Sequence, residues 1–256
     1  MIDVVTTAIR RPELLDLAYR SYFGGGICNL PNLRIILNID PISCGSSDQM
    51  VAIAHKYATE VVIRNSDEAN FATAVNWAWA QVESPFFLHL EDDWLIRRPV
   101  DFEEWLKCLE ADPNALQAVL LRKRARTEPR PFSFRPHLAK SEVIARVGSI
   151  PTDKNPEKFV AESLGPGVSI DFGLPYGFHD LGRKWAKAQH LKKAEGAAGL
   201  QINPQVKDWF TERPASIIGK IDYFCCHIRW RCSLLKVSLW QRLVRFRNSF
   251  LGRRTF

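Results

Sequence analysis

Short apolar runs alternate with amphipathic stretches through the first half of the chain. The apolar runs predict strands at residues 3–6, 33–38, 61–64, 86–90 and 118–121. The stretches between them predict helices that begin near Pro12, Ser47 and Phe71, with a further helix over residues 101–111. Strands that alternate with helices are typical of β-α-β units on a mostly parallel sheet. The pattern therefore predicts an α/β fold with a Rossmann-like half-domain.

Polar residues follow four of these predicted strands. They are Thr6, Thr7 and Arg10 after the first, Asp40 after the second, Asn70 beyond the third, and Glu91, Asp92 and Asp93 after the fourth. Because open parallel sheets bind ligands at the carboxyl ends of their strands, we expect these side chains to converge on one cleft. The alternative explanation for any one of them is that loops are commonly polar.

The strongest chemical signal is the segment 86–96 (FFLHLEDDWLI), an apolar strand that ends in three consecutive carboxylates. In an extended chain Glu91 and Asp93 share one side and Asp92 faces the other, so the outer two can address one ligand. Clustered carboxylates repel each other unless a cation is present, and hard oxygen ligands favour Mg²⁺ or Mn²⁺ over zinc. The segment therefore predicts a divalent ion, Mn²⁺ or Mg²⁺.

At this motif the chain resembles the family 2 glycosyltransferases of the GT-A fold. Segment 4–15 (VVTTAIRRPELL) is similar to that family's opening strand and nucleotide loop, and 35–43 (IILNIDPIS) to its second strand. Segment 70–78 (NFATAVNWA) resembles the start of a later helix of the family. The resemblance covers residues 1–125 and then thins. The chain departs from the family pattern at Arg10, at Ala72 and at Glu91, where asparagine, glycine and aspartate are usual.

The resemblance implies a Rossmann-like GT-A fold, a mostly parallel sheet flanked by helices. It also implies metal-dependent transfer of a sugar from a nucleotide-diphosphate donor, with a UDP-sugar favoured, onto a glycan or lipid-linked acceptor with inversion. Carried over, it places Thr7 and Asp40 at the nucleobase, Arg10, Asn70 and Asn76 near the nucleotide, Glu91 or Asp92 at the ribose or sugar, and Asp93 on the metal. Breaking the sugar–phosphate bond loads negative charge onto the departing diphosphate, which a metal would stabilise.

An inverting transfer also needs a base for the proton of the acceptor hydroxyl. Our candidate is Glu157 in segment 152–164, with Glu162 and Asp171 as rivals. An acid at a helix start is otherwise an ordinary first-turn residue. By resemblance, His179 completes the metal or pyrophosphate shell, although a lone histidine is more often structural. Arg183 and Lys184 follow as candidate phosphate partners.

The charge of the chain is concentrated at its C-terminus. The formal net charge is +7, but residues 220–256 hold nine basic residues and one acid, a net +8, so the other 219 residues sum to −1. A near-neutral body argues against nucleic-acid binding. Residues 236–250 carry large apolar side chains at helical spacing among arginines, which predicts a basic amphipathic helix on an anionic membrane surface. The alternative is a helix docked on the protein's own core.

These features divide the chain into a nucleotide-sugar-binding half at 1–125, a loop-rich acceptor-side region at 126–215 and a basic C-terminal tail at 216–256. No apolar run reaches the roughly 18 residues of a membrane span, and the N-terminus has the reverse charge order of a signal peptide. The six cysteines show no zinc-site spacing. We expect a cytoplasmic protein, peripheral on the cytoplasmic membrane face, that acts in surface polysaccharide biosynthesis.

Two other functions compete with this interpretation. A sugar-nucleotide nucleotidyltransferase shares the fold, but the glycine-rich, lysine-bearing opening loop expected of it is missing. A non-catalytic membrane-surface scaffold would use only the tail, and the intact acidic cluster speaks against it. A dehydrogenase is disfavoured because no G-x-G-x-x-G follows the first strand.

Overall fold

The structure is a computed structural model, and it describes most of the first 172 residues and three short segments beyond them. The described residues are 1–24, 27, 30, 32–43, 45–96, 100–119, 126–172, 178–182, 191–193 and 210–212. Arg183, Lys184 and the whole C-terminal tail, including its predicted membrane helix, lie outside them. Among the described helices, none has the length and apolar character needed to cross a membrane.

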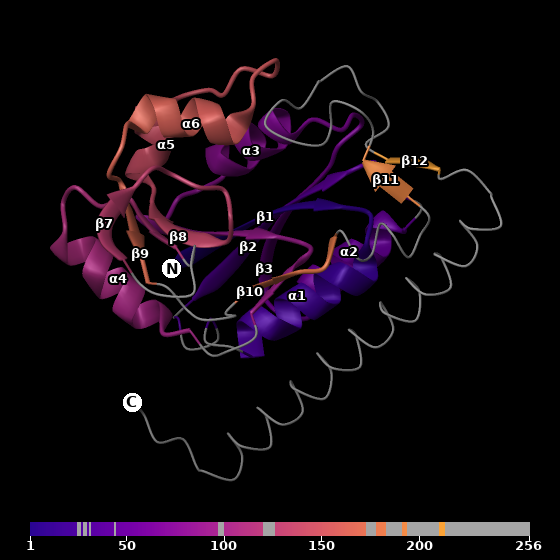
Figure 1. Ribbon diagram of the computed structural model, residues 1–256. Coiled ribbons are helices and arrows are strands. Elements are labelled where there is room, and N and C mark those ends of the chain that lie inside the picture. Colours follow the sequence, from indigo (N-terminus) through magenta and orange to yellow (C-terminus); the bar gives the residue numbers. More distant parts are fainter. Residues whose placement is uncertain are drawn as a thin grey trace, which may run out of the picture.

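An eight-stranded sheet forms the centre of the molecule (Figure 1). Its strands are β1 (Ile2–Ile9), β2 (Leu33–Asp40), β3 (Glu60–Asn65), β4 (Phe86–Glu91), β6 (Gln117–Val119), β7 (Arg126–Arg130), β8 (His137–Lys140) and β9 (Ser169–Asp171). Their order is β3-β2-β1-β4-β8-β6-β9-β7. Only β8 and β7 run against the others, because β8 pairs antiparallel with β4 and β6 and β7 pairs antiparallel with β9. The predicted mostly parallel α/β sheet is confirmed.

Helices cover both faces of the sheet. They are α1 (Pro12–Gly24), α2 (Ser47–Ala54), α3 (Phe71–Ala80), α4 (Phe102–Ala111), α5 (Glu142–Val147) and α6 (Pro156–Leu164). Helices α1, α2 and α4 share one hydrophobic core, and α3, α5 and α6 share the core on the opposite face (Figure 1). Because both faces are covered, β1 and β2 are buried at nearly every position.

The predicted helix starts are confirmed, and side chains cap three of these helices and also α6. Ser46, Asn70, Asp101 and Asn155 each accept a hydrogen bond from a backbone N–H in the first turn of α2, α3, α4 and α6. Such caps satisfy backbone donors that have no partner inside the helix. The helix expected over 101–111 accordingly begins at Phe102, with Asp101 as its cap.

The region after residue 125 has more regular structure than its sequence predicts. Strands β7, β8 and β9 join the same sheet as β1–β4, and α5 and α6 pack on one face of it. These strands are three to five residues long, too short for an alternating pattern to stand out. Two small antiparallel ribbons complete the described structure. They are β5 (Trp94–Ile96) with β10 (Phe178–Asp180), and β11 (Leu191–Lys193) with β12 (Phe210–Glu212).

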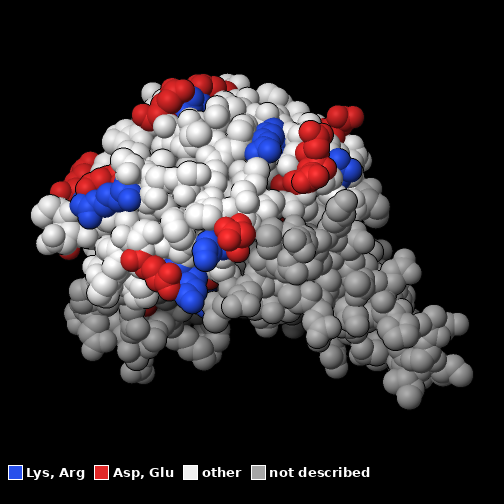
Figure 2. All heavy atoms as spheres, turned by 90° about the horizontal axis from the view of Figure 1, so that it is seen from above, with Lys and Arg blue, Asp and Glu red and all other residues white. Residues whose placement is uncertain are grey.

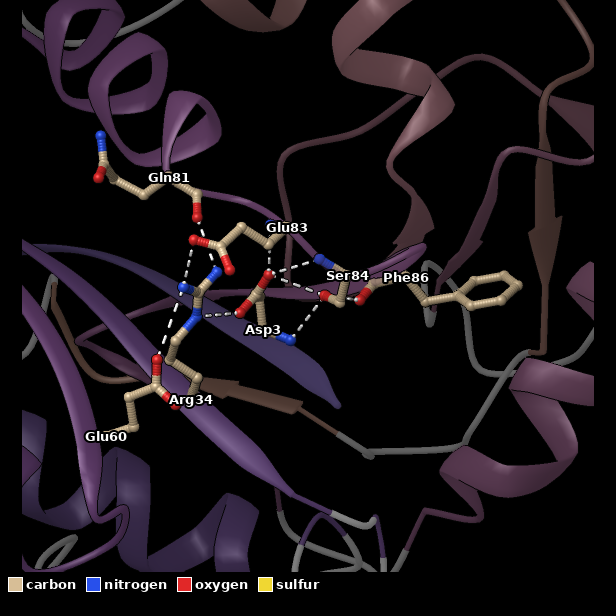
Figure 3. Close-up of polar contacts among 7 residues, drawn as sticks. All are labelled: Asp3, Arg34, Glu60, Gln81, Glu83, Ser84 and Phe86. Atoms are coloured by element: carbon tan, nitrogen blue, oxygen red, sulfur yellow. Dashed lines mark hydrogen bonds and ion pairs between the residues drawn. The ribbon is translucent and has the colours of Figure 1, made fainter.

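A buried ionic network ties the amino ends of three strands together (Figure 3). The Asp3 carboxylate accepts hydrogen bonds from Arg34 Nε at 2.7 Å, from Ser84 Oγ at 2.8 Å and from the backbone N–H groups of Glu83 and Ser84 at 2.8 and 3.0 Å. Arg34 also donates to the carbonyl of Gln81 at 2.8 Å. Burial opposes ionisation, but these bonds outweigh it and lower the pKa of Asp3. The network fixes where β4 begins relative to β1 and β2.

Two stacked histidines lie in the core between β4 and β8. His89 and His137 are opposite each other in the strand register, with ring centroids 5.1 Å apart and planes inclined by 13°. Both side chains are fully buried and contact the ring of Phe134. Burial lowers the pKa of His89 well below its usual value and that of His137 to about 3. Both imidazoles are therefore neutral at physiological pH.

Charged side chains are well mixed on the face seen from above in Figure 1. Figure 2 shows basic and acidic residues there in small adjacent groups, and no large area of one sign is visible among the described residues. This distribution agrees with the near-neutral body inferred from the sequence, on this face of the molecule.

Candidate functional site

A row of polar side chains crosses four strands at the carboxyl edge of the sheet. Thr7 on β1 pairs with Asn38 on β2 and with Glu91 on β4, and Asn38 pairs in turn with Arg64 on β3. Residues paired in this way point to the same face. That face is the one covered by α3, because the positions two residues earlier in β1 and β2 belong to the α3 core. The expected convergence of Thr7 and Glu91 is therefore observed.

Asp40 extends this row by one step along β2. It is 6% exposed, and its Oδ1 accepts a hydrogen bond from Asn38 Nδ2 at 2.8 Å. Burial raises its pKa to about 6, although Asn38, the charge of Arg64 and the backbone N–H of Asn70 oppose the shift. Asn38 Oδ1 is buried and has no hydrogen-bond partner among the described residues. This end of the row thus concentrates hydrogen-bond acceptors.

The acidic segment turns sharply instead of continuing as an extended strand. Asp92 and Asp93 form the turn between β4 and β5. Arg11 Nε donates to Asp92 Oδ2 at 2.9 Å, and Arg11 Nη2 donates to Asp92 Oδ1 at 2.5 Å and to Asp93 Oδ2 at 3.1 Å. The side chains of Arg11 and Asp92 are 6% and 4% exposed. Asp92, which the sequence placed at the ribose or sugar as an alternative to Glu91, is in the structure the buried partner of Arg11.

The Arg11–Asp92 pair is ionised at neutral pH. Burial raises the pKa of Asp92 to about 6 despite the adjacent guanidinium, which still leaves the carboxyl group charged at pH 7. Burial alone would lower the pKa of Arg11, but the carboxylates of Asp92 and Asp93 outweigh it and raise that pKa. The positive charge of Arg11 is therefore permanent and balances one of the three acids.

Negative charge from several elements surrounds Glu91. Burial raises its pKa well above 4.5, and four other carboxylates raise it further. In decreasing order of effect these are Asp93, Asp92, Asp180 on β10 and Glu157 on α6. The described side chains thus bring five acids from β4, the following turn, β10 and α6 close together. A cation bound beside them would favour the ionised form of Glu91.

The donor set fits a divalent ion that is shared with a ligand. No group of three Asp, Glu, His or Cys side chains in the described ranges is placed to hold an ion by itself. Magnesium-type sites commonly use one or two carboxylates, with substrate phosphates and water as the remaining ligands. Glu91 and Asp93 supply hard oxygens of that kind. The site is therefore suited to Mg²⁺ or Mn²⁺ only together with an oxygen-rich ligand.

The segment after β10 closes over Asp93. The backbone N–H of Leu181 donates to the carbonyl of Asp93 at 2.9 Å. A Cβ atom at Gly182 would lie 2.0 Å from Asp93 Oδ2 and 3.3 Å from Arg11 Nη1. His179 pairs with Leu95 through its backbone, beside this contact, but its side chain lies outside the described part of the structure. Its predicted role at the metal or pyrophosphate stays a prediction.

Glu157 lies in the first turn of α6. Its Oε1 accepts a hydrogen bond from Ser133 Oγ at 3.1 Å, and its charge is among those that raise the pKa of Glu91. The rival Glu162 is exposed and forms an ion pair with Lys158 at 3.7 Å. The other rival, Asp171, is buried in β9. The structure therefore brings Glu157, and not Glu162, to the acidic cluster.

The two asparagines of the α3 region hold the backbone of other segments. Asn70 Oδ1 accepts the N–H of Thr73 at 3.0 Å, and Asn70 Nδ2 donates to the carbonyl of Thr152 at 3.3 Å. Asn76 Nδ2 donates to the carbonyl of Ile150 at 2.8 Å, and its Oδ1 accepts the N–H of Ile150 at 2.9 Å. The amide of Asn76, which we expected near the nucleotide, is thus engaged in fastening the loop before α6 to α3.

Arg10 joins the loops that follow β1 and β2. Its backbone N–H donates to the carbonyl of Ile42 at 2.9 Å. A Cβ at Gly45 would be 2.3 Å from the Arg10 carbonyl oxygen, so the two loops touch backbone to backbone. Arg10 Nε is buried without a hydrogen-bond partner in the described structure. A buried, unsatisfied guanidinium nitrogen is costly unless a ligand completes it.

Four residues of the site did not emerge from the sequence. Asn38 carried a usable signal, because it lies two positions before Asp40 and so shares its face. Arg11, Arg64 and Asp180 did not, because their roles depend on contacts between distant segments: Arg11 and Asp92 are 81 positions apart. Arg11 directly follows the arginine that the sequence singled out, and Asp180 directly follows His179.

Solved structures show the same fold. No family model matches the sequence, and neither does any curated protein. Residues 1–349 of S. aureus TarS match with 10% identity and a TM-score of 0.51, over 74% of this chain and 64% of that one. The same TarS segment in complex with UDP matches with 12% identity and a TM-score of 0.50, over 68% and 58%.

A third solved structure covers nearly the whole chain. The mannosyltransferase PcManGT from Pyrobaculum calidifontis, in complex with GDP-Man and Mn²⁺, matches with 13% identity and a TM-score of 0.53, over 98% of this chain and 75% of that one. The chain spans less than two thirds of the TarS chains. Identities this low establish the fold alone. The protein has the GT-A glycosyltransferase fold, as the sequence resemblance implied.

Proposed function

We propose that the protein is a metal-dependent glycosyltransferase that moves a sugar from a nucleotide-diphosphate donor to a hydroxyl group of a glycan or lipid-linked acceptor. The observation that carries this proposal is the position of Glu91 and Asp93. They lie at the carboxyl edge of a GT-A sheet, in a cluster whose negative charge exceeds what Arg11 balances. The UDP complex of TarS and the GDP-Man and Mn²⁺ complex of PcManGT support it as relatives in fold.

The proposed nucleotide subsite is the end of the polar row that lies on β1 and β2. Asp40 and Asn38 offer a carboxylate and an amide oxygen, both of them acceptors, next to Thr7. Uracil, thymine and guanine each present a ring N–H donor that acceptors of this kind recognise. Adding the family resemblance, we favour a UDP-sugar as the donor.

Asp93 is the proposed metal ligand, with Glu91 beside it. A Mg²⁺ or Mn²⁺ ion shared between Asp93 and the donor would offset the charge of the departing diphosphate. Arg10 lies on the loop after β1, and its buried Nε suits a phosphate oxygen of the donor. This role for Arg10 agrees with the nucleotide contact expected from the sequence.

Glu157 is the proposed base. As the acceptor oxygen bonds to the anomeric carbon, its proton passes to Glu157 and the bond from the sugar to the diphosphate breaks. Ser133 Oγ donates a hydrogen bond to one oxygen of Glu157 at 3.1 Å, and the charge of Glu157 acts on Glu91. Following the family resemblance, we propose that the transfer inverts the anomeric configuration.

The experiment measures donor turnover with Mn²⁺ across UDP-, GDP-, dTDP- and CMP-sugars. Asp93→Asn should lower turnover by about 100-fold or more, on the scale of lost electrostatic stabilisation. Glu162→Gln is the matched control, because Glu162 is exposed and pairs only with Lys158 among the described residues. Full activity of Asp93→Asn would refute the metal role. Absence of both nucleotide binding and turnover would favour the scaffold alternative.

The proposed place of action is the cytoplasmic membrane face, in surface polysaccharide assembly. The support is the net charge of +8 over residues 220–256, together with the apolar side chains of 236–250. Removing residues 236–256 should shift the protein from anionic vesicles to the supernatant in a sedimentation assay. Unchanged partition would rule the tail out as the anchor.

A further inference from the structure

Arg11 and Gly182 contact the same carboxylate oxygen, Asp93 Oδ2. Arg11 Nη2 donates to it at 3.1 Å, and the Gly182 backbone lies so close that a Cβ there would be 2.0 Å from it. The carbonyl of Asp93 is held as well, by the N–H of Leu181 at 2.9 Å. Asp93 is therefore fastened at its backbone and at one of its two side-chain oxygens.

We propose that Arg11 and Gly182 are positioning residues that fix Asp93 so that only its Oδ1 is presented to the metal. This inference rests on the proposed function, because it assigns a role within the same site. Asp92 anchors Arg11 in this arrangement: it accepts two hydrogen bonds from the guanidinium, at 2.9 and 2.5 Å. The anchored guanidinium then aims its remaining contact at Asp93.

The chemistry of arginine explains why this residue type is needed. A guanidinium is planar and donates in a fixed fork, so a bidentate bond to one carboxylate also fixes the direction of its other N–H groups. A lysine ammonium in the same place would keep the charge but lose that fork. Burial of Arg11 and Asp92, at 6% and 4% exposure, keeps water from competing for these bonds.

Gly182 acts through its lack of a side chain, which leaves room for the Asp93 carboxylate. Its φ lies outside the left-handed region that favours glycine, so the backbone allows an alanine there, and the obstacle is the contact with Asp93. The Gly182 backbone, shortly after β10, therefore limits the rotation of the Asp93 carboxylate. Residues that orient a metal ligand typically change metal affinity 10- to 100-fold when they are mutated.

A single and a double variant test the role of Arg11. Arg11→Gln leaves Asp92 buried without its partner, so this variant loses stability as well as Mn²⁺ affinity. In Arg11→Gln with Asp92→Asn, two neutral amides replace the ion pair, which should restore stability. Positioning predicts that Mn²⁺ affinity of the UDP-bound double variant stays about tenfold or more below wild type. Wild-type Mn²⁺ affinity in the double variant would overturn the proposal.

Gly182→Ala provides the second test, with Gly24→Ala as its control. Nothing lies within 4 Å of a Cβ built at Gly24, so that variant should behave as wild type. Gly182→Ala should bind UDP without metal as wild type does, but bind Mn²⁺ about tenfold or more weakly when UDP is present. Equal Mn²⁺ affinity would refute the role of Gly182. If wild type itself binds neither UDP nor Mn²⁺, the proposed function fails, and the positioning role of Arg11 and Gly182 fails with it.

Discussion

At the scale of single residues, Asp40 shows how a binding group is kept at a cost to stability. It is buried at the carboxyl edge of the sheet, and burial raises its pKa to about 6 from 3.8. A raised pKa means that folding favours the protonated form. The contribution of Asp40 to the free energy of unfolding is therefore complete below pH 3.8 and is lost as the pH rises through 6.

Asp40→Asn should accordingly stabilise the fold at pH 7 by about 1–3 kcal/mol and weaken UDP binding. Urea unfolding at pH 7 and at pH 4 measures the first effect, which should shrink at the lower pH. Thermal shift with UDP measures the second. The control is Asp48→Asn, an exposed acid in the first turn of α2. A variant less stable than wild type at pH 7 would contradict the assignment.

Glu91 and Asp93 lead to a second prediction at this scale. With at most two protein carboxylates available, Mn²⁺ should bind at least tenfold more tightly when UDP supplies phosphate oxygens. By linkage, Mn²⁺ should tighten UDP binding by the same factor. Calorimetric titration of each ligand in the absence and presence of the other tests both statements. Equal Mn²⁺ affinity with and without UDP would show that the protein holds the ion alone.

At the scale of elements, β4 is positioned from both of its ends. The Asp3 network fixes its beginning, and the Arg11 bonds to Asp92 fix the turn at its end. The two networks lie on opposite edges of the sheet, because Asp3 and the acidic turn are at opposite ends of paired parallel strands. The position of Glu91 thus depends on contacts far from the site.

Asp3→Ala should lower the free energy of unfolding by about 3–5 kcal/mol, because it leaves Arg34 buried without its main partner. Arg34 is 4% exposed, so its guanidinium is largely removed from water. Denaturant unfolding measures the loss. Asp67→Ala, at an exposed position after β3, serves as the comparison. A loss below 1 kcal/mol would mean that Glu83 and Glu60, which also pair with Arg34, suffice to hold it.

Sequence patterns predict the elements well where the pattern is long. The first four strands and the first four helices lie where the apolar periodicity places them. Strand β1 runs on to Ile9, past its predicted end at Thr6, because Thr7 is a buried polar residue that a hydrophobic pattern does not count. Strands β7 to β9 escaped prediction because three to five residues carry too little periodicity.

The candidate site was predictable in its location but not in its pairings. The position of Thr7, Asp40 and Glu91 follows from the rule that parallel strands share a carboxyl edge. The hydrogen bonds between Arg11 and Asp92 do not follow from this rule, because they require a turn where the sequence suggested an extended chain. The hydrogen bond from Asn76 to the backbone of Ile150 likewise depends on a loop 74 positions away.

At the scale of the whole molecule, the two core histidines should shape the response to acid. Both are neutral in the fold because burial lowers their pKa, whereas the unfolded chain protonates them below about pH 6.5. A lowered histidine pKa gives stability that is present above 6.5 and is lost as the pH falls. As the pH falls through that range, each histidine lowers the free energy of unfolding by up to about 1.4 kcal/mol per pH unit. Asp40 and Asp92, with raised pKa values, act in the opposite direction.

His137→Phe isolates this contribution. The stability difference between variant and wild type should shift in favour of the variant by up to about 1.4 kcal/mol per unit between pH 6 and pH 4. Urea unfolding over that range supplies the curve. His55→Phe serves as the comparison, because His55 is exposed at the end of α2. A flat curve for His137→Phe would mean that the folded protein protonates His137 as readily as the unfolded chain does.

The insertion of β8 between β4 and β6 has a consequence for biosynthesis. The strand that carries the acidic cluster gains its second neighbour only when residues 137–140 have been made. At ribosomal rates of about 5–20 residues per second, the side of β4 that later pairs with β8 stays unpaired for several seconds. Unpaired strands of this kind readily recruit foreign partners. We therefore expect the nascent chain to be open to chaperones between the synthesis of β4 and that of β8.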